Sequence, residues 1–286
     1  MHNSEWSLIL FTVLGQFSAG LTTGLLILHL SGLQKTGINL QQTLRKAIMV
    51  AALCMVVAML ASFFHLSAPL ASVYALSNLK HSWLSREILM VSVFTGLLLI
   101  TSVRLLYFDR DGKKLSLLLI LNASAGLLMV YSMAKIYMLP TVPAWNNPHT
   151  LIRFFTGGFI SGIGFLLIFP GLSQIKPLYS DNSRILYIFA GIISAALLIR
   201  LAGSFLAGST VPDENIAFVP QIPLTAILLP WILWFTGCIL LIWQVFKPAA
   251  QPTRSGNLKK LAFLLIIIAA FIDRYFFYEL FYRLGI

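Results

Sequence analysis

The sequence predicts an all-α integral membrane protein with about eight transmembrane helices, and three observations support this fold class. Of the 286 residues, 58% are hydrophobic and only 10% are charged. A soluble domain carries about 25% charged residues, so this chain has too few to cover a surface that faces water. The apolar residues fall into runs of roughly 20 to 25, the length that crosses a bilayer as a helix. No soluble domain interrupts these runs, so residues 1–286 are expected to form a single polytopic membrane domain.

The first apolar run begins near Ser7 and is expected to be a transmembrane helix, not a cleaved signal. It is too long for the apolar part of a signal peptide, has no basic segment before it, and follows Glu5.

Turn-forming segments rich in proline, glycine and aspartate separate many of the later runs. The eight predicted spans are Ser7–Leu30, Lys46–Leu66, Glu87–Phe108, Leu115–Leu139, Leu151–Leu172, Arg184–Leu206, Ile222–Phe246 and Lys259–Phe281. The turn segments are Ala68–Pro69, Asp109–Gly112, Pro140–Pro148, Ser209–Pro220 and Pro248–Gly256.

The fifth predicted span contains a stripe of small residues. Its members are Gly157, Gly158, Ser161, Gly162 and Gly164. Small residues at such spacing let helices pack closely in lipid, and we expect that role here. Room for a flat ligand is the alternative that the same residues leave open.

The distribution of basic residues predicts the orientation of the chain in the membrane. Thirteen of the 20 lysines and arginines lie in or beside the first, third, fifth and seventh connections, and five lie on the opposite face. Basic residues accumulate in cytoplasmic loops, so both termini are expected on the outer, periplasmic side. The same rule accounts for the net charge of +11 without a nucleic-acid partner.

Neither haem nor an iron–sulfur cluster is expected in this chain. The two cysteines, Cys54 and Cys238, cannot supply the four ligands that a cluster needs. His29 and His65 end their spans on opposite sides of the membrane, so they cannot form a bis-histidine pair at one depth. We therefore predict no metal site.

Polar residues at membrane depth gather towards the outer face. An ionisable side chain there costs roughly 2.5–3.5 kcal/mol on insertion scales, so each one calls for a reason. His65 ends the second predicted span, Glu87 begins the third, and Arg274 lies in the outer half of the eighth. Gln16 lies at middle depth in the first span, and Trp145 lies in an outer loop.

These residue types suit the oxidation of a quinol, which releases two protons and two electrons. Glu87 and His65 are the candidate catalytic residues, since a carboxylate or imidazole near a quinol hydroxyl can accept its proton. A neighbouring cation, Arg274 or Arg86, can tune the pKa of such an acceptor. Trp145, Tyr137 and Trp83 are the aromatic candidates to flank a planar ring.

Each of these residues also has an ordinary structural interpretation. His65 can cap the carbonyls of a helix end, and Glu87 can be an acid in the first turn of a helix. Trp145 can belong to an interfacial aromatic belt, and Arg274 can pair with a structural carboxylate. Their shared location on one face favours a functional site.

The sequence resembles the anchor subunit of bacterial dimethyl sulfoxide reductases. The similarity covers nearly the whole chain, is strongest in the first 165 residues, and follows the order of the family's motifs. The matching residues are Glu5, Trp6, Phe11, Thr12, Val13, Gly15, Gln16, Ala19, Gly20, His65, Leu66, Pro69, Leu84, Ser85, Glu87, Ile88, Thr141, Val142, Pro143, Trp145, Gly157, Gly158, Arg274, Phe277 and Tyr278.

The resemblance implies a haem-free anchor with eight helices that binds menaquinol near the outer face of a bacterial cytoplasmic (inner) membrane. Such an anchor carries the site of quinol oxidation but not the terminal reductase site. It passes electrons to an iron–sulfur subunit, which relays them to a molybdopterin catalytic subunit. His65 and Glu87 match positions that the family ties to its quinol site.

Two other functions remain open from the sequence. A transporter or permease fits eight spans, although transporters often place their polar groups at mid-membrane within repeated halves, and no repeat is apparent here. A structural or assembly protein would use the same polar residues only for packing.

Overall fold

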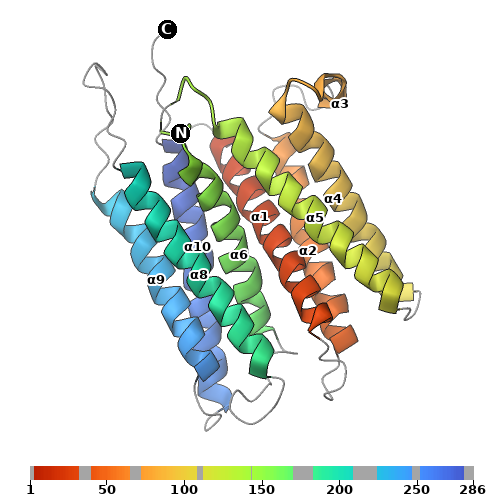
Figure 1. The fold of residues 1–286 in the computed structure, drawn as a ribbon, viewed down its shortest axis with the longest axis vertical. Helices are drawn as coiled ribbons and strands as arrows, with labels where there is room; N and C mark the ends of the chain where they lie inside the picture. The colour runs from red at the N-terminus through yellow and green to blue at the C-terminus, as the bar shows by residue number, and fades with distance from the viewer. Residues whose placement is uncertain are drawn as a thin grey trace.

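The computed structural model describes residues 3–31, 40–64, 72–107, 112–142, 144–169, 183–208, 224–246 and 252–279 (Figure 1). Every regular element in these ranges is helical, and eight of the helices are long and apolar enough to cross a membrane. The helices are α1 (Asn3–Leu30), α2 (Leu40–Phe63), α3 (Ser72–Ala75), the 3-10 helix η3 (Leu76–Asn78), α4 (Trp83–Tyr107), α5 (Gly112–Tyr137), α6 (Pro148–Ile168), α8 (Ser183–Gly208), α9 (Leu224–Phe246) and α10 (Pro252–Glu279). The predicted all-α fold with eight spans is confirmed.

Several helices begin earlier than the apolar runs predicted. Helix α2 begins at Leu40 instead of Lys46, and α10 begins at Pro252 instead of Lys259. The added turns are polar, and a helix can extend past the hydrocarbon because water solvates such side chains at the interface. The predicted ends at Leu66 and Leu172 lie outside the described residues.

The eight spans form two groups of four that meet along α1 and α6. The first group contains α1, α2, α4 and α5, and the second contains α6, α8, α9 and α10. Helix α1 packs against α2 and α5 in its own group and against α6 and α10 in the other. It is therefore more completely surrounded by protein than any other span.

The close approach of α1 and α6 depends on glycine. A Cβ atom at Gly20 would overlap the carbonyl oxygen of Gly158, and one at Gly162 would overlap the backbone of Gly20 and Leu21. Without side chains at these positions, the two backbones reach van der Waals contact. The packing role expected for the small residues of the fifth span is thus what the structure shows.

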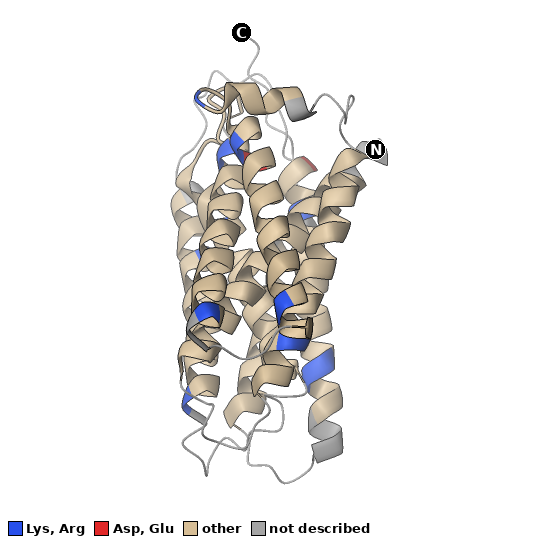
Figure 2. Cartoon of the chain, turned by 90° about the vertical axis from the view of Figure 1, so that its right-hand side faces the viewer, with Lys and Arg blue, Asp and Glu red and all other residues tan. Residues whose placement is uncertain are grey.

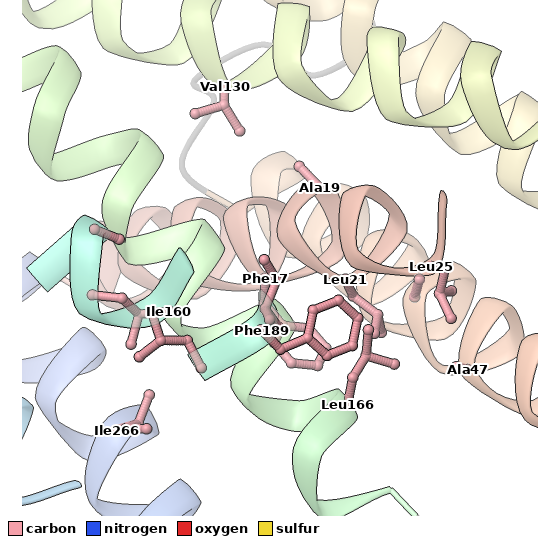
Figure 3. Packing of buried hydrophobic residues seen from close by; sticks show 14 of the residues in the cluster. Phe17, Ala19, Leu21, Leu25, Ala47, Val130, Ile160, Leu166, Phe189 and Ile266 are labelled. Atoms are coloured by element: carbon pink, nitrogen blue, oxygen red, sulfur yellow. The ribbon is translucent and has the colours of Figure 1, made fainter. Parts of the chain in front are cut away.

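Apolar side chains fill the space between the two groups. Figure 3 shows Phe17 and Leu21 of α1 near Leu166 of α6 and Phe189 of α8. All four are buried, and they belong to one continuous core. This core holds the spans together, so that the polar residues near its end have fixed neighbours.

One end of the bundle carries the polar side chains that concern function. We call it the N-terminal end, since α1 begins there; α4 and α6 also begin there, and α5 and α10 end there. In Figure 2 the acidic segments in view lie towards this end, whereas basic segments occur at both ends.

Candidate functional site

Five aromatic side chains pack together at the N-terminal end, where the two groups of helices meet. They come from α5, the α5–α6 connection, α6 and α10, and we call them the aromatic cluster: Tyr137, Trp145, Phe154, Phe277 and Tyr278. The ring centroid of Tyr137 lies 5.3 to 5.6 Å from those of the other four. Such edge and tilted contacts fix the rings relative to one another.

Trp145 joins the connection before α6 to α10. Its ring stacks on that of Phe277 with centroids 5.4 Å apart, and its Nε1–H donates to the Phe277 carbonyl oxygen at 2.8 Å. One face of the indole is thus occupied by protein. The residue has a clear packing role at the site where it was predicted to flank a ligand ring.

Arg274 and Gln16 meet beside this cluster. The guanidinium carbon of Arg274 lies 3.8 Å above the centroid of the Phe154 ring, a distance typical of a cation–π contact. Its Nη2 donates to Oε1 of Gln16 at 3.1 Å. The exposed fractions are 2% for Arg274 and 4% for Gln16, so both polar groups are buried from water.

Three N–H-bearing atoms at this contact have no hydrogen-bond partner within the described part of the chain. They are Nε and Nη1 of Arg274 and Nε2 of Gln16. A buried donor without an acceptor costs about 1–3 kcal/mol, so the arrangement is unfavourable unless an oxygen atom from outside the chain completes it. These atoms therefore mark a place for a ligand oxygen or an ordered water.

A row of hydroxyls runs past the same place. The Tyr137 and Tyr278 oxygens are 3.1 Å apart, and the Tyr278 hydroxyl donates to Thr12 Oγ1 at 3.4 Å. Thr12 donates in turn to the Leu8 carbonyl oxygen at 2.9 Å. The row links α5, α10 and α1. The sequence singled out Tyr137 only as an aromatic ring and did not predict the row, because tyrosines near span ends usually belong to an interfacial belt.

Glu87 lies close enough to this row to influence its two tyrosines. It stands in the second turn of α4, with an exposed fraction of 8%. Its charge acts electrostatically on the hydroxyls of Tyr137 and Tyr278, and the charge of Arg274 acts on the same two groups. The structure thus brings three of the predicted residues, Glu87, Arg274 and Gln16, to one region around the tyrosines.

The structure does not bring Arg86 to that region. Its guanidinium lies 4.2 Å from the centroid of the Trp83 ring and donates to the carbonyl oxygens of Leu79 and Lys80 at 2.9 and 2.7 Å. Arg86 therefore ties α4 to the connection before it. His65, the other predicted proton acceptor, lies outside the described residues.

A largely buried ion network that the sequence did not predict lies next to the site. Asp273 binds Arg153 Nη2 at 2.9 Å with one oxygen and Arg200 Nη2 at 2.5 Å with the other. Arg200 also donates to the Arg153 carbonyl oxygen at 3.0 Å and to Thr156 Oγ1 at 3.2 Å. The signal available in the sequence was that these opposite charges lie inside three predicted spans. Their pairing could not be predicted, because it depends on the depth and rotation of each helix.

Arg153 connects this network to the aromatic cluster. Its guanidinium carbon lies 5.1 Å from the centroid of Phe277, and that of Arg274 lies 5.0 Å from the same ring. Within the described residues, no group of three or more His, Cys, Asp and Glu side chains is placed to hold a metal ion. The polar groups described in this region are hydrogen-bond donors and acceptors of side chains.

These features define a polytopic helical membrane protein with buried charged side chains, among them Glu87 and Arg274, at one end of the bundle, where two groups of helices meet. Comparison with known proteins then gives the family. The chain belongs to the DMSO reductase anchor subunit (DmsC) family, whose model matches residues 1–282. The resemblance inferred from the sequence is confirmed, and membership implies that the chain anchors a reductase complex to the membrane.

Two relatives from Escherichia coli (strain K12) illustrate the relationship. The C subunit of anaerobic dimethyl sulfoxide reductase is 26% identical over 291 residues, which covers 98% of this chain and 96% of the relative. The YnfH subunit of anaerobic dimethyl sulfoxide reductase is 31% identical over 161 residues, and that match spans about half, 55%, of each protein. Family membership favours the anchor function over the transporter and assembly alternatives.

Proposed function

We propose that this chain is the membrane anchor and menaquinol-oxidising subunit of a molybdopterin-containing respiratory reductase of the dimethyl sulfoxide reductase type. The membrane is the cytoplasmic (inner) membrane of a bacterium. The family supports the anchor role. One observation supports quinol oxidation: three unpaired, buried N–H-bearing atoms lie in the same region as a buried carboxylate.

The two kinds of polar group match the two tasks of quinol oxidation. N–H groups of Arg274 and Gln16 hold one ring oxygen and stabilise the negative charge that develops as its proton leaves. Glu87 accepts a proton, and His65 is the second acceptor by the family resemblance. The protons leave on the outer side, and the electrons pass to an iron–sulfur subunit and then to the molybdopterin subunit, where the terminal reduction takes place.

The Glu87→Gln variant tests this function in the complete reductase complex. Glutamine keeps the size of the side chain but cannot accept a proton, so quinol-dependent turnover should fall about 10²-fold or more. Turnover with a reduced dye that donates electrons directly to the partner subunits should remain at the wild-type rate. Both rates are measured on complexes that contain equal amounts of the anchor.

Glu279→Gln is the matched control, since Glu279 is an exposed carboxylate at the same end of the bundle. It should leave both activities unchanged. A Glu87→Gln complex that oxidises quinol at the wild-type rate would remove Glu87 from the mechanism. Loss of the dye-dependent activity as well would show that the change disturbs assembly instead.

A further inference from the structure

The row of hydroxyls described above has a definite donor direction. Thr12 has one hydroxyl hydrogen, and the Leu8 and Ile9 carbonyl oxygens engage it at 2.9 and 3.1 Å. Thr12 Oγ1 can therefore only accept from Tyr278, as the structure shows. With the Tyr278 hydrogen committed to Thr12, the hydrogen between the two tyrosines must come from Tyr137.

This order leaves the Tyr137 oxygen as an acceptor. Among the described residues, Tyr278 is its hydrogen-bond partner, and its remaining lone pair can receive an O–H group. The ring cannot turn away, because four aromatic rings pack around it. Its exposed fraction is 9%, so water is largely excluded.

The location of this oxygen relates it to the proposed quinol site. The Tyr137 ring packs against Phe154 and Phe277, the two rings that the Arg274 guanidinium contacts. Glu87 also acts electrostatically on the Tyr137 hydroxyl, so this oxygen lies near both the N–H donors and the carboxylate. A quinol oxygen bound by Arg274 and Gln16 would present its hydroxyl hydrogen to this region, whereas a quinone oxygen has no hydrogen to present. The donors alone cannot distinguish the two redox forms, since quinol and quinone oxygens both accept hydrogen bonds.

We propose that Tyr137, held as an acceptor by Tyr278 and Thr12, makes the site prefer quinol over quinone. Quinol has hydroxyl hydrogens to donate to the Tyr137 oxygen, whereas quinone has none and faces an acceptor with its own lone pairs. Substrate is bound more tightly than product for this reason, and oxidation removes the hydrogen bond that held the ring. The inference rests on the proposed quinol oxidation and assigns Tyr137 as a residue that determines specificity.

The test measures KM for a short-chain menaquinol analogue and the inhibition constant of the corresponding quinone, with the whole reductase complex. Tyr137→Phe keeps the ring and removes the oxygen, so KM for quinol should rise about fivefold, the size expected for one neutral hydrogen bond. The inhibition constant of the quinone should stay the same or fall. Tyr131→Phe, on the same helix with its ring against Trp83, is the control and should change neither constant.

Thr12→Val provides a second, independent measurement that a general loss of structure would not reproduce. Without the Thr12 acceptor, the Tyr278 hydroxyl is free to donate to Tyr137, which then turns its own hydrogen towards the ligand. The preference should shift towards the oxidised form, with a higher KM for quinol and a lower inhibition constant for quinone.

Equal changes of both constants in Tyr137→Phe, or no change in their ratio in either variant, would overturn the role of Tyr137 and leave quinol oxidation standing. A wild-type complex that neither oxidises quinol nor binds quinone would overturn the proposed function itself, and the specificity role with it.

Discussion

Asp273 is the carboxylate that balances the charges of arginines in the second helix group. A single carboxylate binds Arg153 and Arg200, and the next residue in the chain is Arg274. The network holds α6, α8 and α10 at one rotation, and that rotation directs Arg274 to Gln16. Three arginines around one carboxylate also leave the region with an excess of positive charge, which favours an oxygen that is losing its proton.

Replacing Asp273 with Asn should destabilise the isolated anchor by about 3–5 kcal/mol, because the buried Arg200 and the partly buried Arg153 lose their counter-charge. Thermal or denaturant unfolding of the purified chain in detergent measures this loss. Adding Arg200→Met to the Asp273→Asn chain should recover part of the stability, since it removes one of the uncompensated charges. An Asp273→Asn chain as stable as the wild type would show that the network does not stabilise the fold.

Membrane depth alone predicted part of the candidate site. Glu87, Gln16 and Arg274 stood out because polar groups within apolar runs need a partner, and the structure brings them to one region. The sequence could not separate Arg86 from them, because one residue along a helix turns a side chain by about 100°. It could not find the Tyr137–Tyr278 pair either, since the two residues meet only through the packing of α5 against α10.

At the scale of elements, the contact between α1 and α6 decides the geometry of the site. The backbone of Gln16 lies against Gly158, so the distance between these two helices also sets the position of the Gln16 side chain. Hydropathy predicted that these helices exist. The glycines of α6 predicted that this helix packs closely against a neighbour. They did not predict which neighbour, because α1 lies more than a hundred residues away in the sequence.

Gly162→Ala should destabilise the anchor by about 1–3 kcal/mol, since the added methyl group pushes the backbone of α1 away. Gly191→Ala on α8 is the matched control, because a Cβ there meets no atom within 4 Å. That change should leave stability the same or raise it by up to about 1 kcal/mol. Unfolding of both variants under the same conditions gives the comparison, and equal effects would contradict the packing role of Gly162.

For the molecule as a whole, the distribution of basic residues predicts which face the site occupies. The helices place the beginning of α1 and the end of α10 at the same end of the bundle. The excess of lysine and arginine lies in the connections at the opposite end. The site is therefore expected near the outer face of the membrane.

Reporter fusions test this orientation. A reporter enzyme that works only in the periplasm should be active when fused after residue 286 and inactive when fused at residue 176, in the connection between α6 and α8. A reporter that works only in the cytoplasm should give the opposite pattern. The reverse result for both reporters would place the quinol site at the cytoplasmic face.

The central position of α1 also has a consequence for how the chain is made. Of the eight spans, α1 has the lowest mean hydropathy and is the most completely covered by protein, yet it leaves the ribosome first. Its main partner, α6, ends about 140 residues later, and at about 5–20 residues per second the ribosome needs roughly 7–28 s to reach that point. During this interval the nascent chain carries Thr12, Gln16 and the bare backbone at Gly20 without the helix that will cover them. The insertion machinery, or the newly made α2, has to shield this face until the second half of the protein arrives.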